Sequence, residues 1–533
     1  MSYKKILDTV SIHSASELDL THSSSNILPN PGQITYLQEP EDAPQGRHLG
    51  LFSSIILFVS RILGSGFLAN ASGMYIECGQ SPFFFILSWI VAALLAYSGL
   101  YVFLELGSLI PRSGGTKVFL EYIYDRPYMF VSVVFSLYSI MFGFTLLNLF
   151  VFGEYFLHAL GIEPTEFRTR ATGLIFLYIT CAIHGLSVHH GVKVQNFVGA
   201  LKLLLALVIV VTCSYAIIFP SSITHIDNNM PMETFFPVKT SITVTSFSNA
   251  VIRGTFAYGG WNSIHTVTNE IKDPVRTLKI AGPVSLTIIT VTYVTINLAY
   301  LVVIPGEDIV NGGQLVGSLL FERMFGYHIG RQLLTMSAAL CAGGNVFVVI
   351  YTISRVSQEV FREGYLPFSL FMASNWPTDA PLPTLLLSCA LSTLVIVACP
   401  DGDVYSYVVS LESYPQQIFI GLCGIGIFVI HKRHPNIIAP IRSPLVGTLM
   451  VIIISFYLVI TPLIGKNPNP PGMESWIPYT YLGLFCLFLC MLYWACMFVV
   501  GPYFGGYDLV SEEMQHDDGL KYKVWQKVHV PRF

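Results

Sequence analysis

Apolar runs long enough to cross a lipid bilayer recur along the chain and limit what it can fold into. About twelve of them have roughly the 20-residue length that a membrane-spanning helix requires. They lie near residues 49–77, 82–109, 128–160, 170–188, 194–219, 245–270, 278–304, 330–357, 383–399, 404–431, 444–465 and 477–503. Of the 533 residues, 53% are hydrophobic and 11% are charged, whereas about 25% are charged in ordinary soluble proteins. We therefore expect an all-α, polytopic membrane protein with about 12 transmembrane helices.

Glycine-rich segments interrupt two of these runs. One reads RILGSGFL at residues 61–68 in the first run, and the other reads FAYGGW at residues 256–261 in the sixth. Glycine disfavours a continuous helix, so both segments predict a break. Backbone groups freed by a break cannot face lipid and must line a cavity inside the protein. A pair of interrupted helices at matching positions is typical of a transporter's binding site.

The distribution of basic residues predicts the orientation in the membrane. Most lysines and arginines fall in segments that share a side with both ends of the chain. Because cytosolic loops carry an excess of Lys and Arg, we expect both termini in the cytosol. Residues 1–48 are rich in Ser, Asn and Pro and are expected to form a disordered tail. Residues 504–533 are expected to form a second polar cytosolic tail.

The spacing of the two breaks suggests an internal repeat. Five spans separate them, and an odd number of spans reverses the direction of the chain. The second half would then be inverted relative to the first, giving a 5+5 inverted repeat with broken helices 1 and 6. Helices 1–5 would occupy residues 49–219, helices 6–10 residues 245–431, and two C-terminal helices residues 444–503.

The two breaks would present opposite partial charges to one cavity. The outer half of helix 1 starts near Gly64, Ser65 and Gly66, where free N–H groups and the helix dipole favour a carboxylate. The first half of helix 6 ends near Phe256 and Ala257, where free carbonyl groups suit an ammonium group. Together these groups match an α-amino acid zwitterion. Alternatively, both glycine clusters only allow close packing between helices.

The side chains at the second break indicate what kind of amino acid would fit. Phe256, Tyr258 and Trp261 are aromatic, and neither break contains an acid. We expect a large neutral substrate side chain, because no carboxylate is available there to attract a cationic one. Phe256 is also a candidate gate, with plain packing as the alternative.

Five motifs resemble the amino acid–polyamine–organocation superfamily. They are RILGSGFL at 61–68, ELGSLIPRSGGTK at 105–117, FAYGGWN at 256–262, NEIKDPVRTLKIA at 269–281 and REGYLP at 362–367. Within it, the chain is most similar to the L-type amino acid transporters and their fungal methionine-permease relatives. The resemblance implies a secondary active transporter that imports a large neutral amino acid, methionine in particular, across the plasma membrane by alternating access. It implies substrate contacts from Ser65, Gly66, Phe256, Tyr258 and Asn262.

Lys202 is the candidate for coupling transport to protons. It lies inside the fifth span, and an ionisable residue within a membrane helix is expected to be functional. The resemblance implies that a lysine here takes the place of a sodium ion between helices 1 and 8. The stretch CAGGN at 341–345 of helix 8 has no Ser or Thr hydroxyl for such an ion. We therefore expect proton symport and no metal. The alternative is a fixed ammonium group that joins helix 5 to helix 1.

Other charged residues of the spans suggest gates and ion pairs. Arg61, about one turn before the first break, is expected to close an inner gate with an acid such as Glu270. Arg253, about one turn before the second break, would pair with an outer acid or screen the substrate carboxylate. His184 and His265 are candidates for proton relay or for plain packing.

The sequence also bears on partners and competing functions. The loop at 161–168 lacks the cysteine by which animal L-type transporters bind a companion chain, so we expect no disulfide-linked heavy chain. No basic stripe indicates nucleic acid, and no nucleotide loop or spaced set of His, Cys and carboxylates indicates an enzyme or a cofactor. Lysines of the tails, such as Lys4 and Lys5, are possible targets of a ubiquitin ligase. An exchanger without ion coupling and a permease-fold nutrient sensor remain alternatives.

Overall fold

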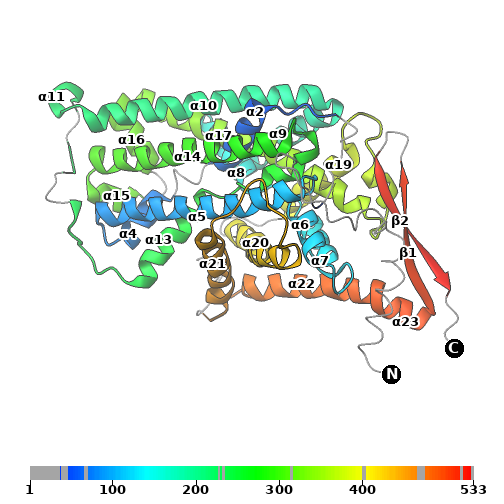
Figure 1. Cartoon of the computed structure of the whole chain (residues 1–533). Coiled ribbons are helices and arrows are strands. Elements are labelled where there is room, and N and C mark those ends of the chain that lie inside the picture. The colour runs from blue at the N-terminus through cyan, green and yellow to red at the C-terminus, as the bar shows by residue number, and fades with distance from the viewer. Residues whose placement is uncertain are drawn as a thin grey trace.

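The computed structural model is a bundle of helices with one β-hairpin at its end (Figure 1). It describes residues 37, 46–64, 70–225, 228–230, 235–312, 316–398, 404–464, 475–515 and 520–529. Within them, eight helices are long and apolar enough to cross a membrane, and three shorter apolar helices accompany them. This confirms the predicted polytopic, helical membrane protein.

The helices and strands fall into two groups along the chain. The first half comprises α2 (Leu51–Ile62), α4 (Ala71–Glu77), α5 (Pro82–Leu109), α6 (Thr116–Ile123), α7 (Phe130–Met141), α8 (Leu147–Ala159), α9 (Glu166–Leu186), α10 (Val188–Ile218) and α11 (Ser221–Thr224). The second half comprises α13 (Val244–Ala257), η1 (Ser263–Glu270), α14 (Pro274–Val303), α15 (Gly306–Gly312), α16 (Val316–Phe325), α17 (Tyr327–Arg362), α18 (Ser369–Ala373), α19 (Leu382–Ala398), α20 (Val404–Arg433), α21 (Leu445–Ile464), α22 (Tyr479–Ala495), η3 (Cys496–Val500), α23 (Gly501–Gly505), β1 (Tyr507–Gln515) and β2 (Lys521–His529).

Both predicted breaks are present. The first apolar run forms α2 and α4, and residues 65–69 between them lie outside the described residues. The sixth run forms α13, which begins with a capping box between Thr243 and Ser246 and ends at Ala257. The 3₁₀ helix η1 follows. Gly260, in the gap between α13 and η1, has a φ of +110°, which residues other than glycine rarely adopt.

A third run is also interrupted, which the sequence analysis did not predict. The run at 128–160 divides into α7 and α8, with residues 142–146 between the two helices. Only one glycine, Gly143, lies in this gap, and its neighbours are apolar. The signal that identified the other two breaks is therefore weak here.

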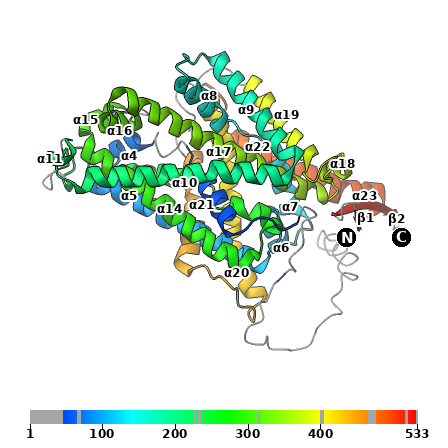
Figure 2. The same ribbon diagram turned by 90° about the horizontal axis from the view of Figure 1, so that it is seen from above.

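The interrupted helix α2 lies inside the bundle and packs against α10, α14 and α17 (Figure 2). Of the long spans, α17 is the most buried, whereas α21 and α22 are the least buried. The backbone of α8 approaches α9 closely at Gly153, where a Cβ atom would lie 2.4 Å from the carbonyl oxygen of Thr169. Small residues at helix contacts are the usual means of close packing in a membrane.

A β-hairpin lies within residues 504–533, where the sequence predicted only a polar tail. Strands β1 and β2 pair in antiparallel register, and β2 contacts the end of α17. The indole nitrogen of Trp525 donates to the backbone oxygen of Glu363 at 2.7 Å. These strands were not predicted because charged and apolar residues occur on both faces of the hairpin, so no alternating pattern marks them.

Ion pairs fix the hairpin to the bundle. The Glu363 carboxylate binds Lys117 of α6 and, at 2.9 Å, Lys523 of β2. Burial alone would raise the pKa of the Glu363 carboxyl, but the two ammonium groups outweigh it and hold this pKa below its usual range. The ionised form of Glu363 is therefore the one that stabilises the docked hairpin.

We predict that Glu363→Gln loosens the hairpin. Since the folded-state pKa of Glu363 is lowered, its contribution is present above the unfolded-state pKa and is lost as pH falls through the folded-state value. At pH 7 the variant should exchange the amide hydrogens of residues 507–529 about 10-fold faster or more, by the loss of a buried charged partner. Hydrogen–deuterium exchange measures this. The control Glu513→Gln removes an exposed charge of β1 and should exchange at the wild-type rate. Equal protection in both variants would contradict the prediction.

Candidate functional site

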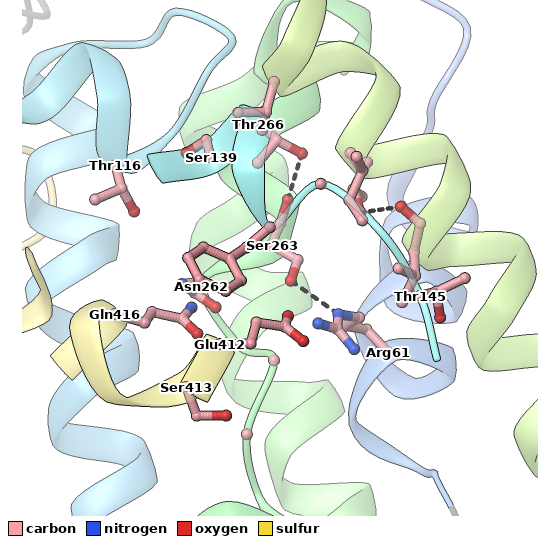
Figure 3. A pocket seen from close by; sticks show the side chains of 18 of the residues that line it. Arg61, Thr116, Ser139, Thr145, Asn262, Ser263, Thr266, Glu412, Ser413 and Gln416 are labelled. Atoms are coloured by element: carbon pink, nitrogen blue, oxygen red, sulfur yellow. Dashed lines mark hydrogen bonds between the residues drawn. The ribbon is translucent and has the colours of Figure 1, made fainter. Parts of the chain in front are cut away.

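A cavity of about 420 Å³ lies where the interrupted helices meet (Figure 3). Its wall includes the end of α2, the gap between α7 and α8 with parts of both helices, the start of α6, the break between α13 and η1, and the facing sides of α17 and α20. Polar groups from all these parts reach the cavity, among them Arg61, Asn262, Asn345 and Glu412. An internal cavity at broken membrane helices is what the two glycine segments predicted.

Four of the predicted substrate-contact residues line this cavity. They are Gly64, Phe256, Ala257 and Asn262. Two others, Ser65 and Gly66, lie outside the described residues. The carboxylate contacts inferred from their N–H groups therefore stay a prediction.

Tyr258 does not line the cavity, which corrects its predicted contact with substrate. It is fully buried, and its ring packs against Trp89 and Tyr293, with ring centroids 6.1 and 5.0 Å away. Since Tyr258 follows the last residue of α13, a rotation of about 100° per residue turns its side chain away from that of Ala257. The aromatic group at the cavity is Phe256, which is half exposed.

The last turn of α2 is capped by side chains from three other helices. The final carbonyl groups of a helix have no partner within it. Here the oxygen of Ser60 accepts a hydrogen bond from Lys202 Nζ of α10 at 2.7 Å. The oxygen of Arg61 accepts one from Asn345 Nδ2 of α17 at 2.8 Å. The oxygen of Ile62 accepts one from the Tyr293 hydroxyl of α14 at 3.1 Å. The Tyr293 hydroxyl is also 3.2 Å from the carbonyl oxygen of Ala257, so the ends of α2 and α13 meet at one side chain.

Lys202 lies where the sequence analysis expected it. Its ammonium group is buried and donates to the carbonyl oxygens of Ser60 and, at 3.0 Å, Cys341. It thereby joins α10 to both α2 and α17. A glycine on α17 makes room for it, since a Cβ atom at Gly344 would lie 2.6 Å from Lys202 Cδ. No acid in the described part of the chain forms an ion pair with Lys202.

Arg61 and Glu270 do not pair with each other, contrary to the sequence prediction. Arg61 donates to Ser263 Oγ and to Asn345 Oδ1, both at 3.2 Å. Glu270 lies beside the start of α2, where its backbone oxygen accepts from Leu49 N at 2.9 Å. Arg61 is at the opposite end of this helix, roughly 15–18 Å away along the axis.

The Glu270 carboxylate has partners of its own. It binds His48 at 3.0 Å, Arg355 at 2.5 Å and the hydroxyl of Tyr351 at 2.5 Å. These contacts link the start of α2, the end of η1 and the C-terminal part of α17. The acid therefore belongs to an ionic cluster with Arg355 and not with Arg61.

Three other residues whose roles the sequence left open have clear surroundings. Arg253 pairs with Glu77 of α4 at 3.1 Å, so the pairing alternative is confirmed. The His184 ring lies against Phe347 and Tyr351. The His265 ring lies against two phenylalanines, of α5 and α6. Neither histidine lines the cavity.

Helix α20 also contributes to the cavity wall, which was not predicted from the sequence. Glu412, Ser413 and Gln416 of this helix all line the cavity (Figure 3). A signal was available, because Glu412 is an acid inside an apolar run and such residues are functional candidates. The lining residues of the gap between α7 and α8, such as Thr145, carried no comparable signal.

Comparison with known proteins agrees with this arrangement. A family model described as amino acid permease matches residues 49–494. The chain belongs to this amino acid permease family. It is 40% identical over 488 residues to the low-affinity methionine permease of Saccharomyces cerevisiae, covering 91% of this chain and 89% of that protein.

More distant relatives extend the comparison. The high-affinity methionine permease of the same yeast is 30% identical over 521 residues, covering 95% of this chain and 88% of the relative. Large neutral amino acids transporter small subunit 2 of Mus musculus is 27% identical over 452 residues, covering 82% and 81%. Family and relatives together identify the permease as an amino acid transporter of the membrane and point away from an enzyme.

We predict that Gly344→Ala disturbs the cap on α2. The added methyl group would meet Lys202 Cδ at 2.6 Å and displace the ammonium group from its two carbonyl partners. The initial rate of amino acid uptake into proteoliposomes should fall about 10-fold or more, since hydrogen bonds of charged groups contribute roughly 1.5–3 kcal/mol. The control Gly73→Ala gains only an ordinary contact, 3.6 Å from Arg253, and should keep the wild-type rate. A Gly344→Ala rate equal to that of the control would contradict this role.

Proposed function

We propose that this permease imports a large neutral amino acid, with methionine as the best candidate, across the plasma membrane by proton-coupled alternating access. The observation that carries the proposal is the cavity at the ends of α2 and α13, with a neutral aromatic side chain, Phe256, on its wall. The 40% identity to a methionine permease supports the choice of substrate.

The substrate's backbone would bind at the breaks. Its carboxylate is assigned to the N–H groups near Ser65 and Gly66, and its ammonium group to the carbonyl groups near Phe256 and Ala257 at the end of α13. A second cavity of about 150 Å³ shares Phe256 and Asn262 with the first. Its wall includes apolar side chains of α5, α13 and α21. This space suits an unbranched thioether side chain.

Lys202 would provide the coupling to protons. As an ammonium ion it forms charge-assisted hydrogen bonds that fix the inner half of the first helix to α10 and α17. Loss of its proton would weaken these bonds and allow α2 to move relative to α17. The absence of Ser and Thr at 341–345 leaves no side-chain hydroxyl there for a sodium ion.

The sequence-based topology supplies the moving parts. We propose two inverted units at 49–219 and 245–431, with residues 444–503 as added helices and both tails in the cytosol. Phe256 and Arg61 would act as gates at the cavity, and Glu270 as an inner gate through Arg355. We also propose that the permease works without a disulfide-linked heavy chain. A ubiquitin ligase would act on its cytosolic tails.

One observation favours a second candidate, an exchanger without ion coupling. The Lys202 ammonium donates to main-chain carbonyl oxygens on two helices, and such contacts also suit a permanent structural cation. In that case the cavity would bind the same substrates, but a proton gradient would not drive their accumulation.

The test is the uptake of radiolabelled methionine into proteoliposomes with and without an inward proton gradient. The wild type should accumulate methionine only with the gradient, and Lys202→Ala should lose this accumulation entirely while it still exchanges internal for external methionine. Lys193→Ala alters an exposed lysine of the same helix and should behave as the wild type. Accumulation that ignores the gradient but requires internal amino acid would indicate an exchanger. Binding without any uptake would indicate a sensor.

A further inference from the structure

The cavity contains one pair of opposite charges on facing walls. Arg61 projects from the end of α2 and Glu412 from α20, and they are the only Asp, Glu, Lys, Arg or His residues among those described that line it. Figure 3 shows the Glu412 carboxylate and the Arg61 guanidinium directed toward each other across the space. Asn262 and Gln416 also line the cavity, and in this view they lie on the side of Glu412 away from Arg61.

In the described part of the chain, each of these two charges has only the other as an attractive partner, and the two form no direct ion pair. Arg61 donates only to neutral oxygens, those of Ser263 and Asn345. The Glu412 carboxylate accepts no hydrogen bond from the residues that the structure describes. The backbone oxygen of Glu412 accepts one from the Tyr138 hydroxyl at 2.8 Å. Glu412 is half-buried on the cavity wall. A ligand between the two walls can supply a donor to Glu412 and an acceptor to Arg61.

The acceptors at the end of α2 do not provide a sufficient site for a substrate cation. The carbonyl groups of Ser60, Arg61 and Ile62 already accept hydrogen bonds from other helices. Two cations, Lys202 and the Arg61 side chain itself, lie beside them. An ammonium group placed there needs a negative charge to offset this repulsion. Glu412 is the one acid of the cavity wall that can supply it.

We propose that Glu412 binds the α-ammonium group of the substrate and Arg61 its α-carboxylate. A zwitterion placed between them meets each charge with its opposite. Asn345 positions the guanidinium at the first break, because it binds Arg61 and its Nδ2 lies 3.4 Å from the Cβ position of Gly64. The side-chain charges thus add to the backbone groups of the interrupted helices. The inference rests on the proposed transport of an amino acid and names the groups that recognise it.

The consequence is specificity for compounds that carry both charges on one carbon. Each charge can be removed separately from the ligand. 3-(Methylthio)propionate keeps the carboxylate and side chain of methionine without the ammonium group, and methionine methyl ester keeps the ammonium group without the carboxylate. Substitution of a residue that recognises one charge should change the Kd only of ligands that carry that charge.

Equilibrium binding to the purified full-length permease tests the assignment. Glu412→Gln should raise the Kd of methionine and of its methyl ester about 10- to 100-fold, by the loss of a charged hydrogen-bond partner. The Kd of 3-(methylthio)propionate should stay constant or fall. Arg61→Gln should raise the Kd of methionine and of 3-(methylthio)propionate and leave the Kd of the methyl ester unchanged. Glu412→Asp, which keeps the charge, should recover most of the affinity for methionine.

The control Glu322→Gln removes a carboxylate of α16, where it bonds to Ser318 outside the cavity, and should leave all three Kd values unchanged. Equal weakening of the binding of all three ligands by Glu412→Gln would overturn the inference. So would an unchanged Kd of methionine together with an altered pH dependence of transport, because Glu412 would then carry a proton. If the wild type binds no neutral amino acid, the proposed function fails and this inference with it. If the wild type binds methionine and Glu412→Gln binds it equally well, only the inference fails.

Discussion

The carbonyl groups at the end of α2 must find partners inside the protein, and much of the structure depends on how they do so. A helix that stops within a membrane leaves main-chain acceptors that lipid cannot satisfy. Here α10, α17 and α14 each contribute one donor, from Lys202, Asn345 and Tyr293. The same three contacts fix the position of the first break relative to the centre of the bundle. The polar wall of the cavity is therefore a consequence of the interruption.

These contacts also connect the cavity to the proposed coupling site. Asn345 bonds to both the backbone and the side chain of Arg61, and Arg61 follows Ser60, the partner of Lys202. A substrate carboxylate at Arg61 and a proton at Lys202 would thus act on adjacent residues of one helical turn. Coupling between the two sites requires no long pathway, because each ligand alters the stability of the same helix end.

The sequence predicted the parts of the molecule that follow from local composition. Apolar length identified the membrane helices, and paired glycines identified the breaks beside Gly64 and Gly260. The lysine at 202 was found because a charge inside a membrane helix is exceptional. The gap between α7 and α8 was missed, since its single glycine among apolar residues differs little from an uninterrupted helix.

The errors concern choices of partner, which depend on three-dimensional geometry. Arg61 and Glu270 are suitable partners by charge, but they lie at opposite ends of α2. Tyr258 adjoins the lining residues in sequence, yet its side chain turns toward Trp89. Glu412 was overlooked although it met the criterion applied to Lys202. Its importance appears only where α20 packs beside the two breaks.

We propose that the substrate binds in the cavity between the interrupted helices. Anomalous diffraction tests it most directly, with crystals of the permease containing ordinary methionine grown in the presence of free selenomethionine. We expect one dominant selenium peak in this cavity, beside Phe256 and on the side away from Lys202. A dominant peak elsewhere, such as on the outer faces of α21 and α22, with none in the cavity, would contradict it.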